Sequence, residues 1–416
     1  MTKQINNQLI YADWLLSCDE NFTIIKNGAM VFGEQIIDTG TLEELKLKYP
    51  NLDAQYGGKS SVLLPGLINS HVHLEFSANK TTLKYGNFMK WLFSVMEHRE
   101  ELIQKATKEL IDIELKQMLK HGTTTIGAIS SYGFDMESCI ESDLNVVYFT
   151  EVLGSKQDMI DTLFIDFQAK LSSAVKNKKV NFIPAVAIHS PYSVHPFLIR
   201  EVLKIATQDN LPVSAHFLES KAENDWLNYS TGEFSSFFKD MLDQHQSLQK
   251  PSDFLKQFKD IKPLSFTHCV EANEKELEQI KQLGATIIHC PNSNRLLNNT
   301  ILNLSYLDNI PLAIGTDGLS SNHTLNLFEE LRNSFFMHTT LDTNHLAQKL
   351  LISATSGGAN ALGLKKGILE KDFDADFICI KLPDVCEDEE DLATAIILHT
   401  SQVETTYIKG KKIELL

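Results

Sequence analysis

Two histidines separated by one residue, His71 and His73, directly follow the strand-like run Leu67–Asn69. Successive side chains of a β-strand alternate between its faces, so both imidazoles point the same way. Two imidazoles that project together form half of a binding site for zinc or ferrous iron. So short a motif also arises by chance in a chain with 14 histidines. It predicts a metal site only if other metal-binding residues lie near it.

Further residues that can bind a metal stand at the ends of other strand-like runs: His216, His268 and Asp317. In a parallel barrel the carboxyl ends of the strands meet on one face, so these residues become neighbours. For each histidine alone, a hydrogen-bonded core histidine is the ordinary interpretation. Histidine and aspartate at four separate strand ends are explained more simply by one metal centre.

Two carboxylates add acid–base chemistry to this face. Glu219 follows His216 by three residues, close enough to take a proton from a bound water and pass it on. A surface glutamate at a helix start is the alternative. Asp317 precedes Gly318, where the backbone can approach a ligand closely. It could bind the metal with one oxygen and hold the attacking water with the other, although Asp-Gly is also a common turn.

The number of metals is indicated by a residue that is missing. Barrels with two metals often bridge them with a modified lysine at the end of the fourth strand. Here the fourth run, Phe182–Ile188, leads into His189 and contains no lysine. We therefore expect one divalent ion, either zinc or iron(II), because three histidines and one aspartate suit both.

Strand-like runs alternate with helical patterns through the middle of the chain. This alternation predicts a (β/α)8 barrel of the TIM type over residues 63–362. The long connection 226–262 is typical of a lid or of a surface insertion. Helical patterns include Glu101–Lys120, Pro196–Asp209 and Asn273–Leu283. The eight runs are Val62–Asn69, Thr123–Ile129, Val146–Thr150, Phe182–Ile188, Val213–Phe217, Leu264–Thr267, Thr286–His289 and Leu312–Thr316.

Both ends of the chain have a different pattern, with short β-rich segments and turn signals. We expect a small β-sandwich domain built from residues 1–62 and 363–416 together, beside the barrel. The segments are Leu9–Leu16, Thr23–Ile25, Ala29–Thr39, Ala375–Ile380 and Thr405–Glu414.

Composition narrows the class of partner. A formal net charge of −16 argues against nucleic-acid binding, which depends on clustered Lys and Arg. No stretch approaches the ~20 apolar residues of a membrane span, and residues 1–21 show no signal peptide. The six cysteines form no CxxC pair, which favours reduced thiols in the cytoplasm. We expect a small-molecule substrate; whether the chain forms a homo-oligomer is left open.

The order and number of these motifs resemble the amidohydrolase superfamily, in its chlorohydrolase and nucleoside-deaminase branch. The resemblance implies that His71, His73, His216 and Asp317 hold one divalent metal. Glu219 would shuttle protons, His268 would hydrogen-bond the attacking hydroxide, and His189 would contact the substrate. The pattern of residues alone leaves open whether His268 is a ligand. The matching segments are Pro65–His73, Gly122–Thr125, Ile188–Tyr192, Ala215–Glu219, Thr267–Val270, His289–Asn294, Thr316–Gly318 and Lys366–Glu370.

Within that branch the chain is most similar to the aminodeoxyfutalosine deaminases of menaquinone biosynthesis. Such an enzyme hydrolyses the 6-amino group of an adenine nucleoside derivative and releases ammonia. Related deaminases tend to carry an acidic residue just before a Trp-Leu pair, where this chain has Lys90, and arginine after the third strand, where it has Glu151. Glu75 and Glu151 are therefore candidates for the ribose contacts; alternatively, Glu75 orients a ligand histidine. The likeness rests on His73–Ser77, Tyr85-Gly86, Trp91-Leu92, Leu153–Ser155 and Ser293–Leu297.

The same likeness adds Trp91, Asn294 and Ser320 as substrate contacts. The substrate of such an enzyme carries a benzoate on an arm beyond the ribose. Arg295 is the candidate partner of that benzoate, because a guanidinium pairs bidentately with a carboxylate. A surface arginine on a loop is the alternative. The rival activities are deamination of methylthioadenosine, S-adenosylhomocysteine or adenosine, and less favoured are a chlorohydrolase or guanine deaminase. A third alternative is not an enzyme but a non-catalytic interaction protein derived from the barrel. It is disfavoured because all the expected metal-binding residues are present.

Overall fold

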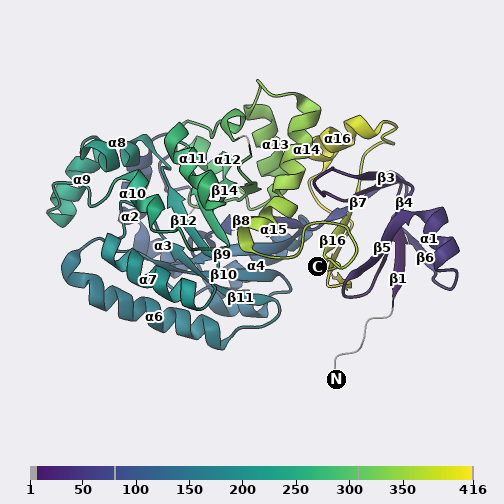
Figure 1. Ribbon diagram of the computed structural model, residues 1–416, viewed down its shortest axis with the longest axis horizontal. Coiled ribbons are helices and arrows are strands. Elements are labelled where there is room, and N and C mark those ends of the chain that lie inside the picture. Colours follow the sequence, from purple (N-terminus) through teal and green to yellow (C-terminus); the bar gives the residue numbers. More distant parts are fainter. Residues whose placement is uncertain (1–6, 79–80, 308, 415–416) are drawn as a thin grey trace.

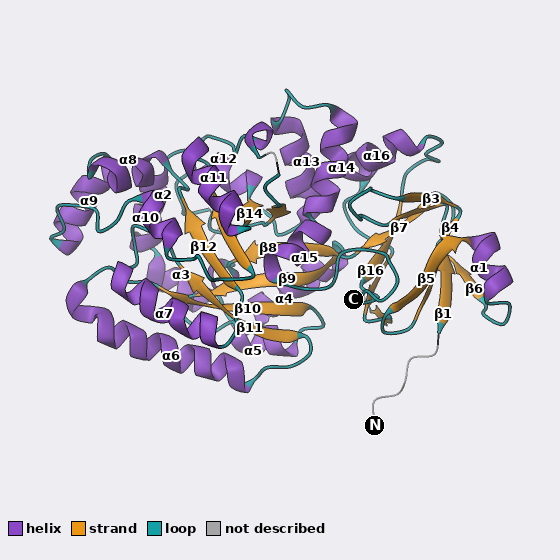
Figure 2. Cartoon of the chain, viewed as in Figure 1, coloured by secondary structure: helices purple, strands orange, loops and turns teal. Residues whose placement is uncertain are grey.

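Eight parallel strands form a nearly closed barrel with helices packed around it (Figure 2). The computed structural model describes residues 7–78, 81–307 and 309–414. The first and last strands lie next to each other, and the N–H of Asp317, just beyond the last strand, donates to the His71 carbonyl at 3.0 Å. The strands are β8 (Leu67–Val72), β9 (Thr123–Ser130), β10 (Asn145–Val152), β11 (Phe182–Ile188), β12 (Val213–Phe217), β13 (Leu264–His268), β14 (Thr286–His289) and β15 (Leu312–Ile314).

The helices of the barrel start and stop at local signals in the sequence. The helix α11 begins at Asn273, whose side chain forms a capping box with Glu276, and ends at Gly284 with φ of 64°. The helix α7 begins with Pro196. The barrel helices are α2 (Phe88–Glu97), α3 (Arg99–Lys105), α4 (Lys108–Lys120), α5 (Met136–Glu141), α6 (Ile160–Lys176), α7 (Pro196–Gln208), α8 (Lys221–Tyr229), α9 (Glu233–Leu242), α10 (Pro251–Lys256), α11 (Glu274–Leu283), α12 (Pro291–Asn298), α13 (Leu327–Met337), α14 (Thr343–Ser353) and α15 (Ser356–Leu362), with short 3-10 turns η1 (Leu74–Phe76), η2 (Gln157–Met159) and η3 (Leu304–Tyr306).

Alternation along the strands decides which side chains face the inside of the barrel. On β10, Val147 and Phe149 belong to one buried cluster with residues of β11, whereas Val146 and Tyr148 belong to another. Side chains two residues apart share a face, so Glu151 projects on the same side as Phe149, toward the barrel interior. The alternation along β10 therefore places the Glu151 carboxylate inside the barrel mouth.

A smaller domain packs beside the barrel and contains both ends of the chain (Figure 1). One sheet has the order β5-β4-β1-β6, and the other, β18-β17-β16-β7-β2-β3, combines strands from both ends. The predicted fold, a TIM-type barrel with a small sandwich from both chain ends, is confirmed. The elements are β1 (Gln8–Tyr11), β2 (Trp14–Leu16), β3 (Ile24–Lys26), β4 (Gly28–Phe32), β5 (Ile36–Thr41), α1 (Leu42–Lys48), β6 (Ala54–Tyr56), β7 (Ser61–Pro65), β16 (Phe377–Lys381), α16 (Glu389–His399), β17 (Thr405–Ile408) and β18 (Lys411–Ile413).

Two expected elements are each divided in the structure. The run 62–69 forms two strands: β7 pairs with β16 and β2 in the small domain, and β8 starts the barrel after Gly66. A Cβ on Gly66 would lie 2.3 Å from the side chain of Thr124, so the chain can pass this point only without a side chain. The helical pattern 101–120 is interrupted at Ala106 and Thr107, between α3 and α4.

The long connection 226–262 is helical and covers one side of the barrel mouth with aromatic side chains. Trp226 stacks on Phe238 with ring centroids 4.7 Å apart, and Phe234 lies 4.7 Å from Tyr192 of the β11–α7 loop. Phe234 also meets Phe88 of α2 at 5.9 Å. The helices α8, α9 and α2 are therefore tied together above the strand ends.

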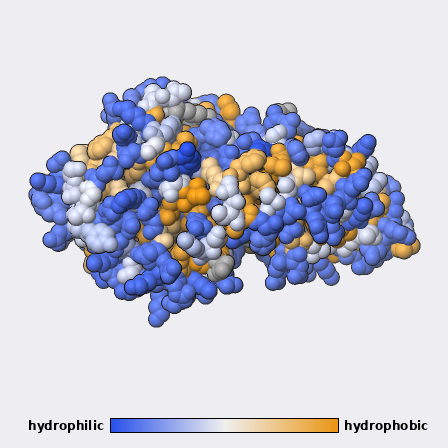
Figure 3. Space-filling model, turned by 90° about the horizontal axis from the view of Figure 1, so that it is seen from above, coloured by the Kyte–Doolittle hydropathy of each residue, from blue (hydrophilic) through white to orange (hydrophobic). Residues whose placement is uncertain are grey.

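The surface in Figure 3 is mostly hydrophilic, with hydrophobic residues gathered toward the middle of that face. Among the described residues, no helix combines the length and the apolar character needed to cross a membrane.

Candidate active site

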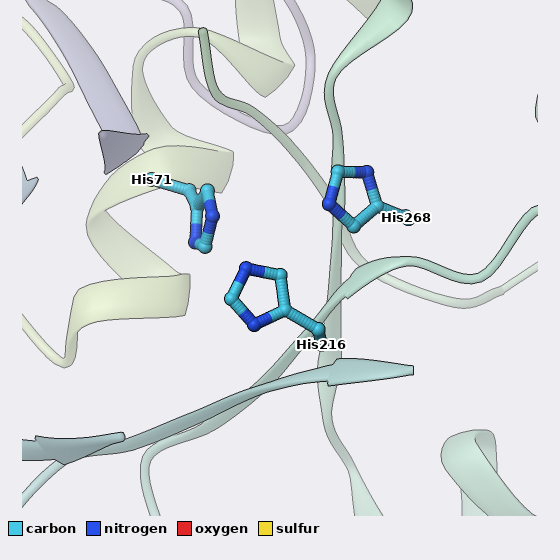
Figure 4. Close-up of side chains that lie close together, drawn as sticks. All are labelled: His71, His216 and His268. Atoms are coloured by element: carbon cyan, nitrogen blue, oxygen red, sulfur yellow. The ribbon is translucent and has the colours of Figure 1, made fainter. Parts of the chain in front are cut away.

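Histidines and an aspartate from separate strands meet at the carboxyl end of the barrel. Three of the histidines lie close together in Figure 4. His71 lies in β8, His216 in β12 and His268 at the end of β13, while Asp317 follows β15. His268 and Asp317 both adopt left-handed backbone conformations, with φ of 72° and 59°. Such conformations are unfavourable for residues with a side chain and are typical of functional sites.

The ligand atoms of this cluster are spaced as a metal ion requires. His73 Nε2 lies 3.3 Å from His216 Nε2 and 3.7 Å from Asp317 Oδ1. Two nitrogens that bind one tetrahedral zinc lie about 3.4 Å apart, given bond lengths of 2.0–2.1 Å. The Nε2 atom of His71 is buried, belongs to the same cluster and has no hydrogen-bond partner among the described residues. These residues therefore fit one divalent metal.

The other ring nitrogen of three histidines is held by a neighbour. His71 Nδ1 lies 3.2 Å from Thr267 Oγ1, and His216 Nδ1 donates to the carbonyl of His189 at 2.7 Å. His268 Nδ1 lies 2.8 Å from Asn294 Oδ1. Partners on Nδ1 fix the ring orientation and leave Nε2 free to face the centre of the cluster.

Burial sets the charges of the site. It lowers the pKa of His71 and His216 far below the usual value, so both are neutral, the form that binds metals. Burial also acts to raise the pKa of Asp317, but His73, His268 and the hydrogen bond from Ser293 outweigh it and hold that pKa well below the usual range. The site therefore combines neutral imidazoles with one ionised carboxylate.

Glu219 lies beside His268 in the same cluster. Its Oε1 lies 3.5 Å from His268 Nε2, and its side chain is buried. Burial and the charge of Asp317 raise its pKa well above the usual value, which favours the protonated acid. An acid of this kind can donate a proton to a basic atom of a bound molecule.

Several neighbours that support these groups were not predicted from the sequence. Ser293 Oγ donates to Asp317 Oδ2 at 2.7 Å, and Glu223 accepts the backbone N–H groups of Leu218 and Glu219 at 3.1 and 2.8 Å. Asn298 donates to the Glu219 carbonyl at 2.8 Å. The only sequence signals were polar residues on helices next to strand ends, which usually indicate a solvated face.

Two of the expected substrate residues lie against the metal-type cluster. Glu151 Oε1 is 4.0 Å from His216 Nδ1, is buried, and has no hydrogen-bond partner among the described residues. Its other oxygen accepts from Ser131 Oγ. The His189 ring is 5.2 Å from that of His216, and burial lowers its pKa to about 4. An unpartnered buried carboxylate oxygen is suited to accept a hydroxyl of a bound molecule.

Glu75 and Asn294 are occupied by the protein itself. The Glu75 carboxylate accepts backbone N–H groups of Ser131, Tyr132 and Gly133 at 2.7–2.9 Å and so holds the loop after β9. Among the described residues, no hydrogen bond joins it to a histidine. Asn294 contacts His268, as described above.

The other three expected contacts lie around the mouth. Trp91 Nε1 donates to the Ser320 carbonyl at 2.8 Å, which joins α2 to the loop after β15. Arg295 is exposed on α12. The roles of all these residues toward a substrate stay predictions.

The chain belongs to the amidohydrolase family, because the model of that family matches residues 62–413. The resemblance predicted from the motifs is thereby confirmed. Over 94% of its length the chain is 45% identical to the aminodeoxyfutalosine deaminase of a Nitratiruptor species, of which it covers 96%. It is 34% identical to an adenosine deaminase of Helicobacter pylori, with 98% of this chain and 99% of that protein covered.

A solved structure extends the similarity to the whole architecture. Helicobacter pylori aminofutalosine deaminase in complex with methylthio-coformycin superposes with a TM-score of 0.93 and 33% identity. The match covers 98% of this chain and 100% of the other.

Proposed function

We propose that this protein removes the 6-amino group of aminodeoxyfutalosine by hydrolysis, with release of ammonia. The observation that carries the proposal is the placement of the buried Glu219 carboxyl group beside His268 and Asp317, within a cluster of buried histidines. The similarity to aminodeoxyfutalosine deaminase supports the choice of substrate. The six cysteines are free, which supports action in the reducing cytoplasm.

We propose that His71, His73, His216 and Asp317 hold one divalent ion, either zinc or iron(II). When bound, such an ion lowers the pKa of a water molecule to about 7, so that hydroxide is available at neutral pH. The donor set of three imidazoles and one carboxylate suits both metals. His268 has the same burial and lies in the same cluster, but its Nε2 faces Glu219 and Asp317 and is better placed to orient the water.

The residues of the chain divide the remaining chemistry. Asp317, fixed by Ser293, and His268 orient the attacking water and accept its proton. Glu219 donates a proton to the purine ring nitrogen next to the carbon that carries the amine, which makes that carbon electrophilic. The proton taken up from the water then passes to the amine, which leaves as ammonia. The hydroxyl proton of the adduct returns to Glu219 as the ring becomes an oxo purine. Glu151 accepts a ribose hydroxyl through its unpartnered oxygen.

A substrate panel with metal analysis tests this proposal. The purified protein should contain one metal per chain, and chelation should abolish ammonia release until zinc or iron(II) is restored. Aminodeoxyfutalosine should give a higher kcat/KM than adenosine or methylthioadenosine. Two metals per chain, or activity that survives complete removal of metal, would contradict the proposed centre.

Deamination of adenosine or methylthioadenosine is the second candidate. The similarity to an adenosine deaminase over nearly the whole chain favours it. In that case the panel would show no preference for the substrate with the benzoate arm.

A further inference from the structure

A guanidinium lies beside the loop that supports Glu151, at a position that the motifs did not indicate. Arg99, the first residue of α3, is exposed, and its Cζ lies 5.2 Å from the centre of the Tyr132 ring. This distance is within the range of a cation–π contact. Among the described residues Arg99 forms no ion pair, whereas the nearby Lys170 is paired with Asp166 at 2.6 Å. Arg99 is therefore a cation that an anionic ligand can still reach.

The ring under Arg99 belongs to a partly exposed aromatic surface. Tyr132 stacks on Phe134 with centroids 5.9 Å apart and lies 6.4 Å from Phe76. Phe76 in turn lies 6.2 Å from the ring of His73 in the metal-type cluster. Aromatic side chains thus lead in short steps from the centre of the site to Arg99, over a length that an extended nucleoside with an aryl arm can span.

The loop that carries Tyr132 is held by hydrogen bonds and is connected to Glu151. Glu75 holds its backbone through Ser131, Tyr132 and Gly133, and Ser131 Oγ donates to Glu151 Oε2. A ligand whose ribose binds the free oxygen of Glu151 would therefore extend over a surface that is already fixed. Fixed partners reduce the entropy lost on binding.

We propose that Arg99, stacked on Tyr132, is the specificity-determining residue that binds the carboxylate of the substrate's aryl arm. The inference rests on the proposed function, because it assumes a nucleoside with an aromatic carboxylate beyond the ribose. The aryl ring packs against the aromatic surface of Phe76, Tyr132 and Phe134, and the carboxylate pairs with the guanidinium. Both parts of a benzoate then have a chemically matched partner. Arg295, exposed on α12, has no comparable aromatic surface described beside it.

The experiment compares kcat/KM for aminodeoxyfutalosine with that for methylthioadenosine, which lacks the carboxylate. In the wild type this ratio should favour aminodeoxyfutalosine. Arg99→Ala should lower the ratio about 10- to 100-fold, the effect of a lost charged hydrogen bond. Arg99→Lys should restore only part of it, because an ammonium neither pairs bidentately nor stacks as a guanidinium does.

Lys105→Ala is the matched control, because it removes an exposed cation from the same helix and should leave the ratio unchanged. A ratio that survives Arg99→Ala, or falls instead in Arg295→Ala, would overturn the assignment of Arg99. A wild type without any preference would overturn the proposed substrate itself, so the two failures are distinguishable. Fluorescence or circular dichroism of each variant separates loss of binding from loss of fold.

Discussion

The catalytic face holds two carboxyl groups whose pKa values are shifted in opposite directions. Burial keeps His71 and His216 neutral and raises the pKa of Glu219, while Asp317 stays ionised. These opposite shifts separate the roles of two carboxylates that lie near the same histidine. The environment of each group therefore predicts which one donates a proton and which one binds a cation.

Glu219 should be essential for turnover but not for metal binding. We expect Glu219→Gln to keep its metal and its substrate affinity, because Gln has the same shape and Glu219 is not in the ligand set. Turnover should fall at least about 100-fold, the lower end of what a positioned acid or base contributes. Metal analysis, calorimetric binding and ammonia release measure the three properties. Loss of metal in this variant would make Glu219 a ligand, and near-normal turnover would make it a bystander.

The residue types and their positions at strand ends were sufficient to predict which side chains form the site. The hydrogen-bond partners of these side chains could not be predicted. His71, His73, His216, His268 and Asp317 were placed together because parallel strands end on one face. Contacts such as that of Asn294 with His268 depend on the angle of a helix relative to a strand, which no local pattern specifies.

Among the structural elements, the turn from β12 to α8 positions the side chain of Glu219. Leu218 has a left-handed backbone with φ of 46°, and the Glu223 carboxylate accepts the N–H groups of Leu218 and Glu219. The first turn of α8 is thus folded back onto the end of the strand. Because Asn298 holds the carbonyl of Glu219, the backbone of the acid is fixed on both sides.

Glu223 should therefore act as a positioning residue. Glu223→Gln replaces one acceptor oxygen by an amide that cannot accept an N–H, so the turn is released on one side. We expect kcat to fall about tenfold, the size of one lost buried hydrogen bond, with KM and metal content nearly unchanged. Steady-state kinetics and metal analysis measure this split.

Glu276 offers a matched control, because it is a buried glutamate that accepts a backbone N–H at the start of α11. Glu276→Gln should lower stability without changing kcat. If both variants lost stability and kcat in the same proportion, Glu223 would be a structural residue only.

Some boundaries of strands and helices could not be predicted from the sequence. The run 62–69 is buried throughout, and hydrophobicity alone cannot show that its first half belongs to another sheet. Pro65-Gly66 is a turn signal in the middle of that run, and it marks the place where the chain passes from β7 to β8. The interruption between α3 and α4 likewise follows from Thr107, whose side chain caps α4.

For the whole molecule, the alternation of strands and helices was sufficient to predict the barrel, and the β-rich ends predicted a shared domain. Handedness and short connections leave few other arrangements for eight such units. What the pattern could not show is how the two domains are joined, because the connecting groups are far apart in the chain. Asp376 is one such group: it accepts from Asn145 Nδ2 of β10 at 2.9 Å and from the Lys409 N–H at 2.6 Å.

Asp376, which also forms a buried pair with Lys366, should hold the small domain on the barrel through Asn145. The charged atoms of Asp376 and Lys366 are 2.6 Å apart, and Lys366 also pairs with the more exposed Asp374 at 2.6 Å. Removing one partner of a buried pair lowers the free energy of unfolding by about 3–5 kcal/mol. We expect Asp376→Ala to lose about 3 kcal/mol, since Asp374 still neutralises Lys366, and Asp374→Ala to lose less. Denaturant unfolding measures the difference, and turnover per folded, metal-containing molecule should equal that of the wild type because neither residue belongs to the catalytic cluster. An equal loss in both variants would show that the contact of Asp376 with Asn145 of β10 contributes nothing to the joining of the domains.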